Sequence, residues 1–254
     1  MKKIFFILLQ IISFLPIAII VLILSVLISK TINYLPNFEN LNWLIQHLFF
    51  NSLFYSISSV LFAFPISLFF AIYLLNLKKN NFYKSLIYLL EFFSLLPSIA
   101  FVVVAVFIII PIMKSLNIDN SFFAVIFSFA FLIIPILTSK IFLLLKNLSS
   151  NFKESLYSLG MSQTETYIYI IIPMLKYELF SIFLMGISIV FGDALIFIFV
   201  INSFDDLYFT FSEYIGRNLL SKDISDISFI FSFILFLMIN FIGLIRGLIR
   251  KENE

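Results

Sequence analysis

Two carboxylates stand inside long apolar stretches, where an ionised side chain is costly. Glu91 lies in the apolar run 85–113, and Asp193 lies in the run 179–201. A charge at the centre of a bilayer costs about 2.5–3.5 kcal/mol on insertion scales, so both acids are expected to face protein or a water-filled path. A substrate or gating role is one interpretation, and a hydrogen bond between helices by a protonated or partnered acid is the other.

Other kinds of chemistry lack the residues that they require. The sequence has no cysteine, which removes disulfides, thiolate metal sites and cysteine nucleophiles, and its single histidine, His47, is not part of an HExxH pattern. A metal centre is therefore not expected. No GxxxxGK[ST] loop occurs, so the chain cannot cradle ATP in the P-loop manner. A lipid-modifying transferase would need a cluster of His, Asp or Arg at a membrane interface, and the sequence has none.

The composition indicates that most of the chain lies in lipid. Of its 254 residues, 62% are hydrophobic and 12% are charged, whereas soluble domains are about 45–50% apolar and 25% charged. The net charge of +2 is small, and the scattered basic residues indicate no nucleic-acid-binding face. The residues that carry chemistry must therefore be positioned by membrane spans.

Six apolar runs are long enough to cross a bilayer, which takes about 20 residues of helix. They are too long and too uniformly apolar for the alternating strands of membrane barrels, so the predicted fold is all-α, with six transmembrane helices in a single domain over 1–254. The first run starts like a signal peptide but exceeds the usual h-region of about 7–15 residues, so we expect it to remain as a span. The runs are 4–29, 52–76, 85–113, 122–145, 179–201 and 227–249.

The basic residues predict the orientation of these spans. Six spans place both termini on one side, and a cytoplasmic N-terminus puts twelve Lys and Arg inside and four outside, the asymmetry of the positive-inside rule. The four outside are Lys30, Lys114, Arg217 and Lys222, and the same outer segments carry Glu39, Asp119, Asp205, Asp206, Glu213, Asp223 and Asp226. Both termini are therefore expected in the cytoplasm.

The segment 146–178 is the longest predicted cytoplasmic stretch, and its residues encode two short helices joined by a turn. Gly160 can take the left-handed conformation that ends a helix, and Pro173 is expected to interrupt the second helix just before the fifth span. Two capping boxes mark the helix starts, Asn151 with Glu154 and Ser162 with Glu165. Such a turn presents a rigid surface to a cytoplasmic partner, and an amphipathic connector lying on the lipid is the plainer interpretation.

The same segment resembles the EAA loop of binding-protein-dependent ABC transporter permeases. The family pattern is E-A-A, three residues, G, nine residues, I, one residue, L-P, and the chain keeps the glutamate, glycine, isoleucine and proline at every interval. The matching residues are Glu154, Ser155, Leu156, Gly160, Ile170, Ile172 and Pro173, with Ser155 and Leu156 for the alanines and Ile172 for the leucine. The resemblance implies a type I ABC importer permease, with this loop as a coupling helix that docks in a cleft of the ATPase subunit.

A second resemblance, to the phosphate-importer permease subfamily, covers most of the chain from residue 65 to 251. That subfamily has an A-I-Y-L segment followed by a helix with a glutamate and P-S-[IV]. Here these are 71–74, Glu91, and Pro97 with Ser98 before Ile99. The resemblance implies inorganic phosphate as the cargo.

The fifth run departs from that subfamily. Of its R-A-[IL]-G-E-[TA] pattern, the chain keeps Gly192 and an acid, Asp193, and lacks the arginine. A Gly-Asp pair at this place is also similar to thiamine, iron and polyamine permeases, which leaves another small solute open. Because a naked carboxylate repels an anion, Glu91 and Asp193 are expected to orient helices, to pair with a partner's basic group, or to recognise the hydrogens of a protonated phosphate. The candidate pathway or gating residues are Glu91, Pro97, Ser98, Gly192 and Asp193.

The permease resemblance implies partners beyond this chain. These are ABC ATPase subunits that bind ATP and Mg²⁺, a second permease subunit, identical or homologous, and an extracytoplasmic solute-binding protein; no cofactor is expected in the chain itself. The acidic segment 202–226 is a candidate contact for the binding protein, or is merely solvated. The expected location is the bacterial inner membrane. An ion-coupled carrier is the remaining alternative, and it should show inverted repeats and several buried ionisable groups.

Overall fold

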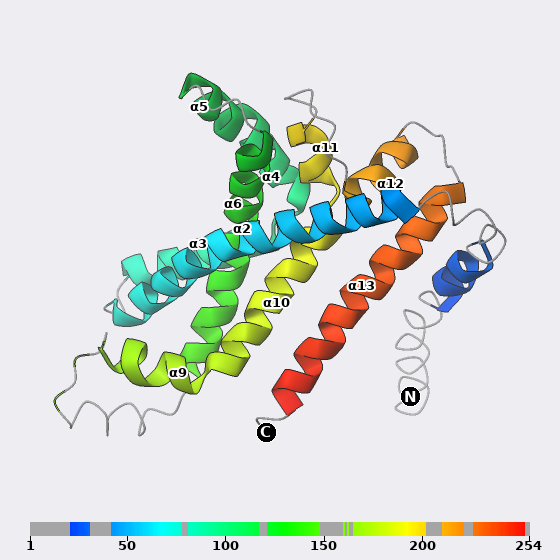
Figure 1. The fold of residues 1–254 in the computed structure, drawn as a ribbon. Helices are drawn as coiled ribbons and strands as arrows, with labels where there is room; N and C mark the ends of the chain where they lie inside the picture. Colours follow the sequence, from blue (N-terminus) through cyan, green and yellow to red (C-terminus); the bar gives the residue numbers. More distant parts are fainter. Residues whose placement is uncertain are drawn as a thin grey trace, which may run out of the picture.

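Helices account for the regular structure, as the apolar runs predict (Figure 1). The computed structural model describes residues 21–30, 42–77, 81–116, 121–147, 160, 162, 165–201, 210–220 and 226–251, and none of these is in a strand. After the helix Val21–Lys30, the elements are α2 (Asn42–Asn76), α3 (Asn81–Leu95), α4 (Ser98–Val104), the π-helix η2 (Ala105–Ile109), α5 (Ile110–Ser115), α6 (Ser121–Lys146), the π-helix η3 (Thr166–Ile171), α9 (Ile172–Met174), α10 (Lys176–Gly192), α11 (Leu195–Ile201), α12 (Phe211–Leu220) and α13 (Asp226–Lys251).

The described ranges contain four helical stretches that are long and apolar enough to span a membrane. They are Ile45–Asn76, Ser98–Ser115, Phe122–Lys146 and Ser228–Ile249. The pair Thr166–Met174 and Lys176–Gly192, bent by 77°, makes a fifth candidate. Most of the first predicted run lies outside the described residues. The all-α membrane class is confirmed.

Two of the predicted spans are interrupted by residues outside the helices. In the run 85–113, α3 ends before Pro97, whose φ of −65° and ψ of 149° are extended. Proline disfavours helix in the residue before it and lacks the N–H that a helix interior needs. In the run 179–201, α10 ends at Gly192 and the next helix starts only at Leu195. Both interruptions fall on residues of the candidate pathway motifs.

The main core forms where α2 and α6 pack along each other and α10 packs against both. Ser67 Oγ in α2 lies 2.9 Å from its own-helix acceptor, the Ala63 carbonyl, and 3.2 Å from the Ile134 carbonyl of α6. A Cβ on Gly186 of α10 would lie 3.0 Å from Val60 Cγ1. Since lipid supplies no hydrophobic drive between spans, close packing and such polar contacts hold the helices together.

The molecule has two distinct ends (Figure 1). At the lower end in the figure, called here the α9 end, α9 lies near the ends of α6 and α13, which carry Lys146 and Arg246. At the opposite end, called the α12 end, lie α5 with Lys114 and α12 with Arg217. Basic residues therefore lie at both ends, and the predicted orientation, in which the α9 end is cytoplasmic, stays a prediction.

Candidate functional site

The turn at Gly160 has the conformation that the sequence predicts. Gly160 has a φ of +84°, and a Cβ placed on it would meet nothing within 4 Å. Glycine is therefore favoured here because of the left-handed backbone conformation, and not because a side chain would meet a neighbouring atom. Glu154, Ser155 and Leu156, the first residues of the predicted coupling loop, lie outside the described residues.

The second predicted capping box is present. The Ser162 N–H donates to Glu165 Oε2 over 2.9 Å, and the Glu165 N–H donates to Ser162 Oγ over 3.3 Å. The Ser162 hydroxyl, and after it the Ser162 backbone, lowers the pKa of Glu165 from its ordinary value. The carboxylate is thus ionised at neutral pH, and its negative charge interacts favourably with the positive N-terminal end of the helix that follows.

That helix turns sharply into α10. The six residues of η3 have the wide π pattern, and the Ile172 N–H at their end donates to the Tyr167 carbonyl, five residues back. Pro173 follows, and Leu175, with φ −95° and ψ 19°, stands at the 77° bend. The predicted interruption of the second helix near Pro173 is confirmed. A π segment and a proline, both of which favour bending of a helix, precede the bend.

The faces of this bent segment differ in burial. Tyr167 and Ile171 are buried in the main core, whereas Tyr169 is 70% exposed. Ile170 is half-buried, and Pro173 is exposed. The segment therefore anchors one side in the helix bundle and leaves the other side open in the isolated chain.

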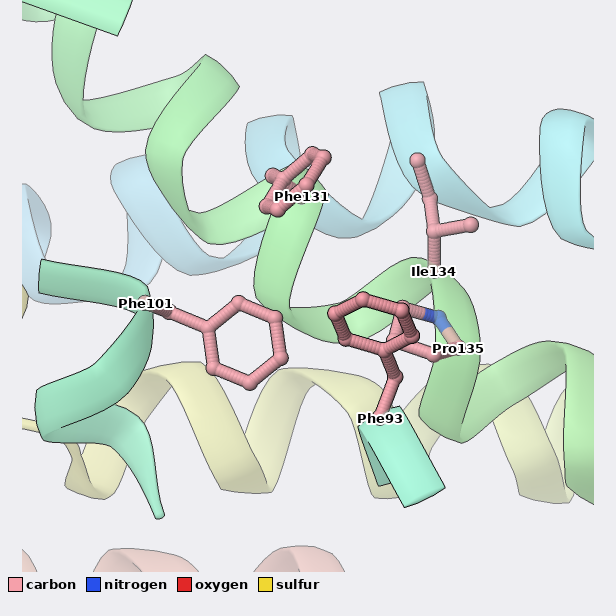
Figure 2. Close-up of a pocket in the computed structure, with 5 residues that line it drawn as sticks. All are labelled: Phe93, Phe101, Phe131, Ile134 and Pro135. Carbon is pink, nitrogen blue, oxygen red and sulfur yellow. The ribbon is translucent and has the colours of Figure 1, made fainter. Parts of the chain in front are cut away.

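The interruption at Pro97 lies beside an apolar pocket. Figure 2 shows Phe93 from α3 and Phe101 from α4, on the two sides of Pro97, facing Phe131, Ile134 and Pro135 of α6. The pocket holds about 230 Å³. Its lining is almost entirely apolar. Burying a charge there without a partner is costly, so the pocket does not suit a charged solute.

The polar residues of the same motif lie outside that pocket. Pro97 is exposed and Ser98 is half-buried as the first residue of α4. Glu91 lies in α3, and its side chain is exposed. It is therefore not packed against the described helices of its own chain, as a buried acid would be.

The interruption after Gly192 is closed by hydrogen bonds on both sides. The Asp193 N–H donates to the Val190 carbonyl over 3.2 Å, at the end of α10. Asp193 Oδ1 accepts the Ile196 N–H over 3.2 Å, at the start of α11. Asp193 is thus a capping residue, whose oxygen satisfies one of the free N–H groups of a helix start. This gives the acid a structural role in addition to any contact with cargo.

The structure brings the two interruptions together and leaves the Gly160 turn apart. The helices α4 and α11, which follow Pro97 and Asp193, pack against each other. The residues leading from Gly160 reach α9, at the opposite end of the molecule from α11 (Figure 1). The candidate residues therefore form two sites, one at the α9 end and one around the interruptions.

A buried acid on α12 is not among the candidate site residues predicted from the sequence. Glu213 is fully buried, and its Oε1 lies 2.7 Å from Arg217 Nη2. Burial raises the pKa of Glu213 from its ordinary value, against the lowering effect of Arg217. Among the acids of the segment 202–226, Glu213 is therefore buried within the chain and not solvated at its surface.

The sequence does contain a signal for this group. Thr210 and Glu213 have the spacing of a capping box, and each accepts a hydrogen bond from the other's N–H, over 3.3 and 3.2 Å. The pattern predicts a helix start but not its burial, which depends on the helices packed around α12. Among the described residues, no group of three or more His, Asp or Glu could hold a metal ion.

Known proteins share both the sequence pattern and the fold. Residues 63–250 match the family model of the binding-protein-dependent transport system inner membrane component. No curated protein matches the sequence. The fold is similar to the crystal structure of a bacterial ABC transporter involved in the import of the acidic polysaccharide alginate, with a TM-score of 0.72, 15% sequence identity and 98% of each chain covered. At this identity the similarity concerns the fold alone.

Proposed function

The chain belongs to the family of binding-protein-dependent transport system inner membrane components, and from this premise we propose that it forms the solute pathway of an ATP-driven importer of inorganic phosphate. As a family member it is a permease subunit of a binding-protein-dependent ABC importer in the bacterial inner membrane. Its contribution is a transport path and not a catalytic centre. The energy comes from ABC ATPase subunits that bind ATP and Mg²⁺.

The contact with the ATPase is formed by residues 151–173, at the α9 end. The observation that carries this proposal is the capped turn of Gly160, Ser162 and Glu165, which leads through η3 and the 77° bend into α10. A turn fixed by hydrogen bonds at its start, and by buried Tyr167 and Ile171 further on, can transmit a displacement to the span that follows. A second permease subunit and an extracytoplasmic solute-binding protein complete the importer.

Phosphate is the proposed cargo because of the motif around Glu91, Pro97 and Ser98. The interruption at Pro97 and the interruption at Asp193 lie on packed helices, which suits a gate built from both. Asp193 caps α11, so we assign it to positioning this helix and not to contact with the anion. The Gly192-Asp193 pair keeps another small solute, such as thiamine, iron or a polyamine, as the second candidate.

Co-purification in mild detergent tests the assignment of the ATPase contact. Gly160→Val places a β-branched residue at φ +84°, a conformation that it strongly disfavours. Gly243→Val is the matched control, because a Cβ at either glycine meets nothing within 4 Å and Gly243 lies in a regular helix. We expect wild type and Gly243→Val to bring down an ATPase and Gly160→Val to lose it. A wild-type chain that folds and recovers no ATPase would refute the proposed function.

Uptake into proteoliposomes that contain the recovered complex and its binding protein tests the cargo. ATP-dependent accumulation of radiolabelled phosphate, competed by unlabelled phosphate and not by thiamine or spermidine, is the expected result. Accumulation of another solute in place of phosphate would overturn the cargo and leave the permease assignment intact.

A further inference from the structure

The short helix α12 is tied to three longer helices at once. Hydrogen bonds connect it to α2, α10 and α13. They are the hydrogen bonds from the Phe211 N–H to Ser52 Oγ over 3.0 Å, from Ser212 Oγ to the Phe191 carbonyl, and from Asn218 Nδ2 to Ser228 Oγ over 2.9 Å. The helix is therefore fixed with respect to the spans around it.

The Ser212 contact closes the end of a broken span. Carbonyl groups in the last turn of a helix have no N–H partner within the helix. Near the end of α10, the Val190 carbonyl accepts the Asp193 N–H, and the Phe191 carbonyl accepts the Ser212 hydroxyl. Phe191 and Ser212 are buried, so water does not readily replace that hydroxyl.

Gly216 lies against the other side of the same interruption. A Cβ on Gly216 would lie 2.6 Å from Ile198 Cδ1 and 3.2 Å from Ala194 Cβ. The backbone of α12 thus lies close to Ala194 and to the Ile198 side chain of α11, and an added methyl group would require the end of the Ile198 side chain to shift. This close contact therefore resists a movement of α12 toward α11.

Internal contacts make α12 stiff enough to act as one body. Glu213 is fully buried and pairs with Arg217 one turn later, with 2.7 Å between Oε1 and Nη2. The capping box with Thr210 closes the first turn. The rings of Phe211 and Tyr214 pack on Phe231 of α13, with centroids 5.5 and 4.9 Å away.

We propose that Ser212 and Gly216 are positioning residues, through which α12 holds α10 and α11 at a fixed angle across the Asp193 interruption. A partner that docks at the α12 end, as a solute-binding protein would, then acts on the interruption through α12. This inference rests on the proposed function for the identity of the partner and for its nucleotide dependence. The geometry of α12 itself does not depend on it.

The cysteine-free sequence allows a direct test of the interruption. Leu195→Cys places one thiol at the start of α11, where the wild-type side chain is half-buried. Its rate of reaction with a water-soluble maleimide is measured in lipid nanodiscs, with and without a non-hydrolysable ATP analogue, in the complex with its ATPase. We expect the rate to change with nucleotide when Ser212 and Gly216 are wild type.

Ser212→Ala leaves the buried Phe191 carbonyl without its donor. We expect labelling at Leu195→Cys at least about fivefold faster, as loss of a buried hydrogen bond implies, and no longer dependent on nucleotide. Ser212→Thr, which keeps the hydroxyl, should restore both properties. Ser128→Ala is the matched control, because buried Ser128 donates only to Ala124 in its own helix.

Gly216→Ala changes the packing of α12 on α11 and leaves the Ser212 hydrogen bond in place. It therefore tests the inference even if the Ser212→Ala variant does not assemble with the ATPase. It should change the labelling rate and its nucleotide dependence, whereas Gly243→Ala, which meets nothing, should not. Unchanged labelling in assembled Ser212→Ala or Gly216→Ala would overturn the inference. Absence of an ATPase from the wild-type complex would instead overturn the proposed function, since labelling of the chain alone still compares Ser212→Ala with wild type.

Discussion

The two ends of α10 are interrupted by different means. At Leu175 the helix bends by 77° directly after a π segment and Pro173, and no side chain caps the start of α10. At Asp193 the interruption is closed by a side-chain cap and by the Ser212 hydroxyl from α12. The first interruption involves residues that are close in sequence, and the second depends on a contact between distant segments. The two ends of α10 can therefore be altered separately.

A third segment shows that a π turn with a proline is insufficient for a sharp bend. In η2 the Ile110 N–H donates to the Ala105 carbonyl, five residues back, and Pro111 follows, as Pro173 follows Ile172. Yet Ser98–Ser115 forms one stretch without a break. The bent segment at the start of α10 differs at Leu175, whose φ of −95° and ψ of 19° lie in the sparsely populated bridge region.

Replacing Pro173 should have the largest effect on this comparison. Pro173→Ala restores an N–H and removes the ring, which favours a continuous helix by about 3 kcal/mol. Spin labels at Ile168→Cys and Phe180→Cys, both on exposed side chains, should move apart toward the roughly 18 Å between these backbone positions in a straight helix. Pro65→Ala is the control, since Pro65 lies inside unbroken α2. An unchanged distance would mean that packing holds this bend too.

Removing Glu213 should weaken only the interruption at Asp193. Glu213→Ala deletes a cap of α12 and removes the ion pair with Arg217, a loss of about 2 kcal/mol once the 34% exposure of the Arg217 side chain is discounted. The apparent melting temperature in detergent should fall by about 4–8 °C. Glu178→Ala, at an acid in the first turn of α10, serves as the control with little change. A shift in the distance between labels at 168 and 180 would show that the two interruptions are coupled.

The Asp193 cap has a smaller expected effect. Asp193→Ala should destabilise the start of α11 by about 1 kcal/mol, whereas Asp193→Asn keeps the oxygen that accepts the Ile196 N–H. Hydrogen exchange in 195–201 should be faster in the alanine variant and close to wild type in the asparagine variant. If asparagine behaves like alanine, the charge matters more than the cap, and a direct role with cargo regains support.

The Ser162 capping box should show the smallest effect, and it depends on pH. The pKa of Glu165 is lowered in the folded chain, so the stabilisation is present at neutral pH and is lost as the pH falls through the lowered value. Hydrogen exchange of 165–171, compared between wild type and Glu165→Gln, should differ at neutral pH and converge in acid, below the lowered pKa of Glu165. A difference that persists in acid would mean that the charge of the carboxylate does not account for the stabilisation.

Several features at the α9 end were predictable because they depend on residues close in sequence. The positive φ of Gly160, the box of Ser162 with Glu165 and the interruption near Pro173 each follow from local backbone chemistry. The residues of the first predicted helix, including Glu154, lie outside the described structure, and their role in the ATPase contact stays a prediction. The π pattern of η3 had no recognised signal in the sequence.

The sequence was a poorer guide to the apolar runs themselves. A run such as 85–113 fits one long helix by length and hydropathy, and hydropathy alone does not reveal the break at Pro97. Pro65 and Pro135 lie inside unbroken helices of the same protein. Whether a proline ends a helix depends on whether neighbours satisfy the freed carbonyl groups, which is a property of the packed bundle.

By itself the sequence determined the membrane class, the helical fold and the permease motif, because hydropathy, turn conformation and motif spacing are local properties of the chain. Only the tertiary structure decided that Glu213 is buried, that Glu91 is exposed in the isolated chain, and that Ser212 and Gly216 meet the Asp193 interruption from twenty or so residues away. These outcomes depend on which helix faces are brought into contact. In a chain whose spans are apolar on nearly every side, the pattern of residues along one helix does not specify its neighbours.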